Sequence, residues 1–257
     1  MITDYHRPQS LQEALKLLSA PNTHPLGGGT VLTHPDAESF AVVDLQALGL
    51  DRLHKSGNNL EIGATVTLQA LLEYTQTPTE LRTAIKVEAP LNLRNMGTVA
   101  GTLVTCDGRS PFAVVMLALD AKLTVVTGES SVINLGDLLL LRHEMLRGKL
   151  ITRIEIPLQT KLSFETVARS PVDKPIICAA LAQWPSGRTR LVIGGWGNSP
   201  SVAMDGNEVS AIEAAARNAA HDAADEWASA KYRSDVAAVL AKRCLGILLG
   251  KRSKNIH

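Results

Sequence analysis

The chain has 257 residues, of which 45% are hydrophobic and 20% charged, so it can bury a sizeable core and has the composition of a globular protein. Its formal net charge of +1 provides no strong field to attract nucleic acid or a membrane surface, and we expect neither as a partner. No apolar run approaches the length of a membrane span.

The cysteines and histidines are not spaced as metal ligands. Cys106, Cys178 and Cys244 stand far apart without a Cys-x-x-Cys, and the seven histidines form no His-x-x-x-His or Glu-x-x-His pair. We therefore expect no zinc or iron–sulfur site held by this chain alone, and no serine-hydrolase Gly-x-Ser-x-Gly is present either. The odd number of cysteines and the lack of a signal peptide favour the reducing cytoplasm.

Local patterns in the first part of the chain predict alternating helices and strands. Ser10-Leu11-Gln12-Glu13 is a capping box, in which Ser10 accepts from an early helical N–H and Glu13 reaches back to the Ser10 N–H. Thr67 can cap a second helix, and Pro111 suits the first turn of a helix from Phe112 to Leu119. Runs rich in β-branched or alternating residues predict strands at 41–45, 60–64, 121–127 and 150–156.

The pattern changes after Pro157, which ends the strand at 150–156. Pro185-Ser186-Gly187 reads as a turn that joins two strands into a hairpin. The expected elements are strands at 163–168, 176–184 and 188–195, followed by helices at 210–221 and 230–249. We therefore expect an α+β protein with a first domain at 1–158, whose lobes span about 1–55 and 56–158, and a small C-terminal domain at 159–257. That domain is expected to hold a three-stranded antiparallel sheet and helices.

Three successive glycines form the first candidate binding loop, Leu26-Gly27-Gly28-Gly29-Thr30-Val31. Glycines allow positive φ and leave no Cβ between the backbone and a ligand, so several N–H groups can point at a phosphate. Thr30 adds a hydroxyl donor. The loop lacks the Lys-Ser/Thr of a P-loop and the spacing of a Rossmann fingerprint, and taken alone it is more often a plain turn after a strand.

The second candidate loop runs from Arg94 to Thr102 and contains the small pair Ala100-Gly101. Thr98 and Thr102 provide hydroxyls, while Val99 is typical of a strand. Taken alone, this segment reads as a tight turn entering a strand. A diphosphate carries charge on two groups and needs donors from more than one side, so two such loops together suit it.

In this order the loops resemble those of the FAD-binding medium subunit of the molybdenum hydroxylases, the xanthine dehydrogenase and carbon monoxide dehydrogenase family. The similarity covers most of the chain and rests on the colinearity of several motifs. They are Arg7-Pro8, Gly27 to Val31, the Arg-x-x-Gly-Thr-x-x-Gly pattern at 94–101, Ala121-Lys122-Leu123, the strand 150–157, the Arg-x-x-x-Asp turn at 169–173 and the Ser-x-x-Tyr-Arg at 229–233.

The resemblance implies a two-lobed FAD-binding domain of the p-cresol methylhydroxylase type, followed by a C-terminal domain of the carbon monoxide dehydrogenase flavoprotein type. FAD would lie between the lobes with its pyrophosphate on the two loops. Ile151 would contact the flavin side, and Arg169 and Asp173 would lie near the isoalloxazine. The implied FAD-binding residues are Leu26, Gly27, Gly28, Gly29, Thr30, Val31, Thr98, Val99, Ala100, Gly101, Thr102, Asp107, Ile151, Arg169 and Asp173, with no catalytic residue and no metal ligand.

Three positions depart from the family pattern. Ala100-Gly101-Thr102 stands where the family has two glycines and an Asn or Ser. Pro111 stands where the family has an aspartate, for which Asp107 is an offset substitute, and Glu165 takes the place of a lysine.

The resemblance implies an electron-transfer subunit of a hetero-oligomer. Electrons would come from a molybdopterin-binding large subunit through a [2Fe-2S] small subunit to FAD, and pass on to NAD+ or another acceptor. Pro111 and the altered second loop leave open an alternative, a scaffold subunit of the same kind of complex that has lost FAD. A stand-alone flavin reductase is a third hypothesis.

Overall fold

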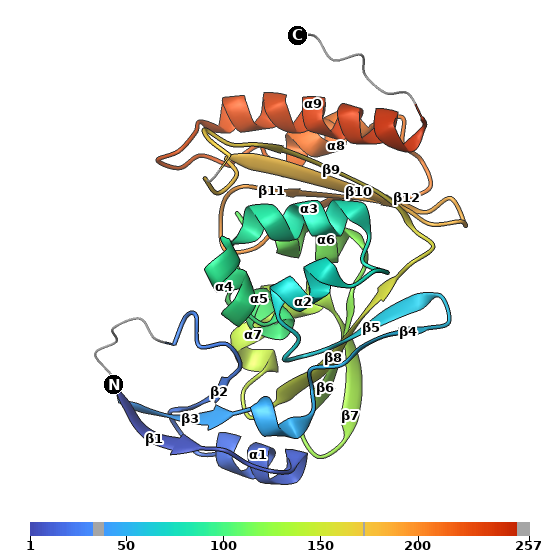
Figure 1. Ribbon diagram of the computed structural model, residues 1–257. Helices are drawn as coiled ribbons and strands as arrows, with labels where there is room; N and C mark the ends of the chain where they lie inside the picture. The colour runs from blue at the N-terminus through green and yellow to red at the C-terminus, as the bar shows by residue number, and fades with distance from the viewer. Residues whose placement is uncertain (33–38, 172, 251–257) are drawn as a thin grey trace. The chain divides into compact units, whose positions relative to one another are not determined.

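The computed structural model describes residues 1–32, 39–171 and 173–250, which pack as two compact units. Unit 1 consists of Met1–Thr77, Ala89–Thr105 and Ala121–Ile156, and unit 2 consists of Pro78–Glu88, Cys106–Asp120 and the chain from Pro157 onward (Figure 1). The chain changes unit close to the boundary expected at residue 158. Two earlier segments also belong to unit 2, so a single cut does not separate the units.

A three-stranded parallel sheet with one helix forms the N-terminal part of unit 1 (Figure 1). Its elements are β1 (Ile2–His6), α1 (Leu11–Leu18), β2 (Thr23–Leu26), β3 (Phe40–Asp44) and the 3-10 turn η1 (Gln46–Leu48), with the strands in the order β1-β3-β2. The predicted cap of α1 is confirmed, because Ser10 Oγ accepts from the Glu13 N–H at 3.3 Å. The Glu13 carboxylate, however, accepts from the Gln9 N–H at 3.0 Å, where we expected the Ser10 N–H.

A five-stranded sheet forms the rest of unit 1, in the order β4-β5-β8-β6-β7. The strands of this sheet are β4 (Leu53–Ser56), β5 (Asn59–Gly63), β6 (Lys122–Val126), β7 (Ser130–Asn134) and β8 (Leu150–Pro157). The helices of this part of the unit are α2 (Leu68–Glu73), α4 (Leu91–Met96), α5 (Val99–Thr105) and α7 (Leu135–Met145). Thr67 caps α2, accepting from the Ala70 N–H at 3.1 Å, as predicted. The strand expected at Val99 is wrong: Val99 begins α5, whose first turn is capped by the Thr98 hydroxyl.

Unit 2 is a four-stranded antiparallel sheet covered by helices on both faces (Figure 1). Its elements are α3 (Thr79–Glu88), α6 (Pro111–Ala118), β9 (Lys161–Val167), β10 (Ile177–Gln183), β11 (Thr189–Gly194), β12 (Ser201–Gly206), α8 (Ile212–Ala219) and α9 (Ala230–Leu248). Helices α8 and α9 cover one face, and α3 and α6 cover the other. The hairpin β10–β11 is confirmed, but the expected three-stranded sheet is wrong, because β12 pairs with β11 as a fourth strand.

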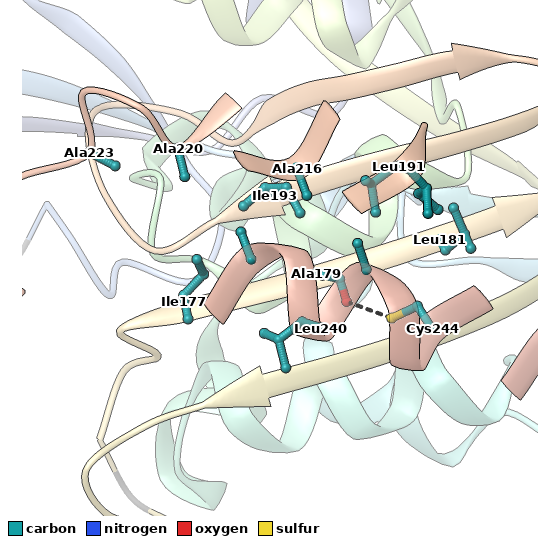
Figure 2. Close-up of a cluster of buried hydrophobic side chains, with 13 residues drawn as sticks. Ile177, Ala179, Leu181, Leu191, Ile193, Ala216, Ala220, Ala223, Leu240 and Cys244 are labelled. Atoms are coloured by element: carbon teal, nitrogen blue, oxygen red, sulfur yellow. Dashed lines mark hydrogen bonds between the residues drawn. The ribbon is translucent and has the colours of Figure 1, made fainter. Parts of the chain in front are cut away.

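The core of unit 2 lies between the sheet and the helices α8 and α9, and Figure 2 shows its side chains. Ile177, Ala179 and Leu181 alternate along β10 and point to the helices, as the period of two in a strand requires. Small residues of the helices, among them Ala216, allow close packing, and Cys244 Sγ lies 3.7 Å from the Ala179 carbonyl oxygen. This packing fixes α9 on the sheet.

No helix among the described residues has both the length and the apolar character needed to cross a membrane.

An ion-pair network ties β11 and β12 to the end of α6, and it provides a prediction on acid stability. Asp205 is paired with Arg188 at 2.8 Å and with Arg190 at 2.7 Å, and both arginines also pair with Asp120. Hydrogen bonds from Arg188 lower the pKa of Asp205 to about 2, and Arg190 adds to the effect. A carboxyl with a lowered pKa stabilises the folded state above its unfolded pKa, and this contribution is lost as the pH falls.

We expect the unit to lose stability as the pH falls from about 4 to 2, and we expect Asp205→Asn to flatten this part of the curve while lowering stability at pH 7. Urea unfolding of both proteins between pH 2 and 7 measures the effect. Asp222→Asn is the control, because Asp222 has a 95% exposed side chain and pairs with the exposed His221. A curve for Asp205→Asn as steep as that of the unmodified protein contradicts the prediction.

Candidate functional site

The two glycine-containing loops lie in direct contact in unit 1. The first follows β2, which ends at Leu26, and the second joins α4 to α5. A Cβ added to Gly28 would lie 1.7 Å from the Met96 carbonyl oxygen, and one added to Gly27 would lie 2.8 Å from Thr98 Oγ1. A backbone oxygen cannot give way to a Cβ at 1.7 Å, so glycine is needed at position 28 for the first loop to pack on the second.

The first loop offers main-chain donors to a ligand. Gly27 and Gly28 are half-buried, and within the described part of the chain their N–H groups donate to no acceptor. Gly29 has a φ of +69°, which turns the chain after them. Thr30 is half-buried and the Val31 side chain is exposed. Half-buried main-chain N–H groups seek a partner, so this arrangement fits the oxygens of a phosphate.

The second loop differs from its expected role. The N–H groups of Val99 and Ala100 donate to the carbonyl oxygens of Val66 and Ala64 at 2.8 and 3.2 Å. The Gly101 N–H donates to Thr98 Oγ1 at 3.1 Å, and the Thr102 N–H donates to the Thr98 carbonyl at 2.9 Å. Each of these four amides therefore has a partner within the protein, which the glycine and threonine content of the loop did not indicate.

The hydroxyls of the second loop are also engaged. Thr102 Oγ1 donates to the Thr98 carbonyl oxygen at 2.8 Å. The Thr98 side chain is almost fully buried and its oxygen accepts from Gly101, so its hydroxyl hydrogen is the one polar group of this side chain left for a further bond. The Thr98 hydroxyl hydrogen is therefore the side-chain donor that this loop can still offer to a ligand.

Ile151 is connected to the second loop through the main chain. It lies in β8, where it pairs with Val125 and is buried. The next residue, Thr152, accepts from the Ala64 N–H at 3.1 Å, and the Ala64 carbonyl in turn accepts from Ala100. Unit 1 thus brings together the expected residues from Leu26 to Val31, from Thr98 to Thr102, and Ile151.

The other three expected residues lie in unit 2. The Asp107 carboxylate accepts from the Arg109 N–H at 2.9 Å and pairs with Lys174 at 3.1 Å. Arg169 stacks its guanidinium 4.4 Å from the ring centre of Trp227, and Asp173 closes a turn by donating its N–H to the Ser170 carbonyl oxygen. Val172, which precedes Asp173 in the sequence, lies outside the described residues.

Trp227 is a residue that sequence reasoning missed. Trp227 is 42% exposed and stacks with the guanidinium groups of both Arg169 and Arg109. Each such contact contributes about 0.5–1 kcal/mol at an exposed site. Nothing in the sequence signals this cluster, because Arg109 and Trp227 stand far apart along the chain.

Arg233 anchors the loop that carries Trp227. Its side chain is fully buried in α9, and its guanidinium donates to both Asp225 carboxylate oxygens at 2.8 Å. It also donates to the carbonyl oxygens of Ile176, Ala223, Ala228 and Gly195. Asp225 in turn accepts from the Trp227 N–H at 2.8 Å. The Ser-x-x-Tyr-Arg motif pointed to Arg233, but nothing in the sequence pointed to its partners.

A carboxylate lies at the helix start where the family's aspartate is replaced by Pro111. Pro111 begins α6, and Glu88 from α3 accepts from Ser110 Oγ at 2.7 Å and from the Phe112 N–H at 3.0 Å. Burial raises the pKa of the Glu88 carboxyl, although the hydrogen bond from Ser110 opposes this shift. Asp107 does not take this place; it pairs with Lys174.

Two substitutions at Glu88 should behave differently. Glu88→Ala leaves Ser110 and the Phe112 N–H without their acceptor, and we expect it to lower the free energy of unfolding by about 1–3 kcal/mol. Because the folded pKa is raised, the contribution of Glu88 is complete below about pH 4.5 and is lost as the pH rises through the folded value. Glu88→Gln keeps a neutral acceptor at every pH, so its stability relative to the unmodified protein should rise between pH 4.5 and 8. Urea unfolding across this range tests both, and a Glu88→Gln protein that weakens with rising pH contradicts the second expectation.

In the part of the chain that the structure describes, no group of three or more His, Cys, Asp or Glu side chains could hold a metal ion. His34 and His257 lie outside that part.

Comparisons with known proteins identify the family. Residues 1–159 match the family described as the FAD binding domain in molybdopterin dehydrogenase. The glyceraldehyde dehydrogenase medium chain of Sulfolobus acidocaldarius is 30% identical over 226 residues, which cover 78% of each chain. The protein YgfM of Escherichia coli is 27% identical over 248 residues, covering 93% of this chain and 94% of YgfM.

Solved structures show the same fold. A carbon monoxide dehydrogenase chain from Hydrogenophaga pseudoflava superposes with a TM-score of 0.80 at 20% identity, covering 97% of this chain and 98% of that one. The chain is therefore a mixed α/β protein with the fold of that carbon monoxide dehydrogenase chain. Since the family match spans more than half of the sequence, the chain belongs to the FAD-binding domains of molybdopterin dehydrogenases and is an FAD-binding subunit of an oxidoreductase.

Proposed function

We propose that this chain is the electron-transfer subunit of a molybdenum-containing dehydrogenase. Electrons enter from the [2Fe-2S] clusters of a small partner subunit, after a molybdopterin-binding large subunit has oxidised the substrate. They leave to NAD+ or another acceptor. Bound FAD supplies the chemistry, because a flavin can take electrons singly and release them as a pair.

One observation carries the proposal: the first glycine loop presents two half-buried N–H groups, from Gly27 and Gly28, with no acceptor among the described residues. Such a pair suits a diphosphate and has no evident structural use. For Asp107, Ile151, Arg169 and Asp173 the support is the family pattern, and we keep them as proposed neighbours of the cofactor. Their own contacts, in particular the stacking of Arg169 on Trp227, hold them in defined positions.

We propose a cytoplasmic hetero-oligomer as the setting. None of the three cysteines, all of which are described, forms a disulfide, and this supports a reducing compartment. The medium-chain name of the relative from Sulfolobus acidocaldarius supports a complex of several subunits.

The experiment is a reconstitution in steps. The purified chain should turn yellow with FAD and quench its fluorescence. In the complete complex, anaerobic mixing with substrate should reduce the clusters before FAD in stopped-flow absorbance. A chain that stays colourless while the complex still assembles supports the scaffold alternative. Steady oxidation of NADH by the isolated, FAD-loaded chain supports the flavin reductase.

A further inference from the structure

We propose that unit 1 binds a small ligand bearing a phosphate group in a pocket beside β4, β5 and β8, which are neighbours in the five-stranded sheet (Figure 1). The pocket has a volume of about 210 Å³, which is below the range of roughly 300–1,000 Å³ for drug-sized ligands. Its lining includes Arg52, His54, Glu61, Gly63, Thr152 and Arg153. No lining residue belongs to the expected FAD-binding set, so the inference goes beyond the proposed function.

The side chains of the pocket favour an anion. Two guanidinium groups, from Arg52 and Arg153, line it together with one carboxylate, that of Glu61. Two positive charges against one negative charge leave the pocket at +1 with His54 neutral. A concave surface with an excess of one sign of charge concentrates ligands of the opposite sign.

Glu61 positions Arg153 without occupying all of its donors. The Glu61 side chain is only 13% exposed, and its Oε2 accepts from Arg153 Nη1 at 2.8 Å and lies 3.4 Å from His54 Nε2. A guanidinium has five N–H donors, of which this contact uses one. Arg153 is therefore held in place by the carboxylate and still has donors for a ligand.

Arg52 has a fixed main chain and an unpaired guanidinium. Its carbonyl oxygen accepts from the Gly63 N–H at 2.8 Å, and the Leu50 carbonyl accepts from the Thr65 N–H at 3.0 Å. A Cβ on Gly63 would lie 2.1 Å from the Leu50 carbonyl oxygen, so glycine allows this close approach. Within 1–32, 39–171 and 173–250, no side chain or carbonyl accepts from the Arg52 guanidinium, which leaves it available to a ligand.

A β-bulge in β8 lies at the same pocket. Val125 of β6 pairs with Ile151 and Thr124 pairs with Arg153, so Thr152 is an extra residue without a partner in the ladder. Bulges bend a strand and change the direction of a side chain, and they are common beside functional sites. An ordinary surface ion pair between Arg153 and Glu61 would contribute little stability and would not need this irregularity.

A phosphate group fits these donors better than a carboxylate does. Guanidinium groups bind phosphate and carboxylate oxygens through two parallel N–H···O bonds. A carboxylate has two oxygens and can be bound in this way by one arginine. A phosphate monoester has three terminal oxygens and up to two negative charges, so it can use both Arg52 and Arg153.

The first test observes the two arginines directly. The full chain, labelled with ¹⁵N-arginine, is titrated at constant ionic strength with inorganic phosphate, with glycerol 3-phosphate and with acetate. Arg52→Lys and Arg153→Lys assign the side-chain N–H resonances. We expect both phosphates to shift the Arg52 and Arg153 resonances to saturation, and acetate to bind more weakly. Because these resonances report on the pocket itself, the result does not depend on whether FAD is bound.

The two phosphates distinguish the source of the group. Tighter binding of glycerol 3-phosphate identifies a small phosphate ester as the ligand, and tighter binding of inorganic phosphate identifies the free ion. Shifts that do not saturate overturn the proposal, because they show general attraction of anions. Acetate that binds as tightly as phosphate overturns the assignment to a phosphate group.

The second test separates guanidinium contacts from charge. Arg52→Lys keeps the charge but loses the paired donors, and we expect it to weaken phosphate binding about tenfold, measured at the Arg153 resonance. Lys55→Gln is the matched control, because Lys55 is an exposed residue of β4 that does not line the pocket. It should change the affinity less than about twofold, since only the general field is altered. Equal affinity in Arg52→Lys and the unmodified protein, or an equal loss in Lys55→Gln, overturns the site.

Discussion

Replacing Arg233 with methionine should lower the free energy of unfolding by about 3–5 kcal/mol, because each of the several buried groups that lose their donor costs about 1–3 kcal/mol. The guanidinium is fully buried, pairs with both oxygens of Asp225, and donates to carbonyls of the chain at Ile176, Ala223 and Gly195. Methionine fills much of the volume but donates to none of them. Several polar groups then lose their partner at once, and Asp225 is left with its charge uncompensated.

Urea unfolding monitored by circular dichroism measures this loss. Arg243→Met is the matched control, since Arg243 is exposed on the same helix, and we expect it to change stability by less than about 0.5 kcal/mol. Adding Asp225→Asn to Arg233→Met should recover part of the loss by removing the unpaired charge. A loss below about 1 kcal/mol in Arg233→Met would mean that the buried network contributes little.

Features that depend on neighbouring residues could be read from the sequence. Ser10, Thr67 and the Pro111 start of α6 were placed correctly, because a helix cap involves residues only a few positions apart. The hairpin β10–β11 follows from a short turn at 185–187 between two strands. The family resemblance likewise rests on short motifs, and the match of residues 1–159 confirms it.

Features that depend on distant residues could not be read in this way. Val99 looks like a strand residue, but it begins a helix because Thr98 caps it and because the Val66 carbonyl accepts its N–H. Strand β12 was missed because its residues, Ser201 to Gly206, are partly exposed and become a strand only by pairing with β11. The place of α3 and α6 in unit 2 is likewise a matter of tertiary packing.

The candidate site likewise has features that the sequence could predict and features that it could not. The glycines of the first loop predicted a close approach of the backbone to a ligand; the structure shows that Gly28 also approaches the Met96 carbonyl oxygen closely. Composition could not predict that the amides of the second loop are engaged, because their acceptors, at Ala64 and Val66, lie more than thirty residues earlier. The stack of Trp227 with Arg109 and Arg169 depends on three separate segments and leaves no local signal.

Gly28→Ala should weaken FAD binding about ten- to a hundredfold. Its Cβ would lie 1.7 Å from the Met96 carbonyl oxygen, a backbone atom, so the first loop must move away from the second. Overpacking of this kind costs about 1–3 kcal/mol, and each 1.4 kcal/mol corresponds to a factor of ten in affinity. Displacement also carries the Gly27 and Gly28 amides away from the diphosphate.

Fluorescence titration with FAD gives the affinities, and circular dichroism shows whether each variant is folded. Gly27→Ala should have a smaller effect, because its Cβ meets the Thr98 hydroxyl at 2.8 Å, and a side chain can shift where a backbone carbonyl cannot. Gly128→Ala is the control, since no atom lies within 4 Å of its Cβ position. Affinity should therefore fall in the order Gly128→Ala, Gly27→Ala, Gly28→Ala. If a folded Gly28→Ala protein binds FAD as tightly as Gly128→Ala, the contact between the loops does not determine how the cofactor is held.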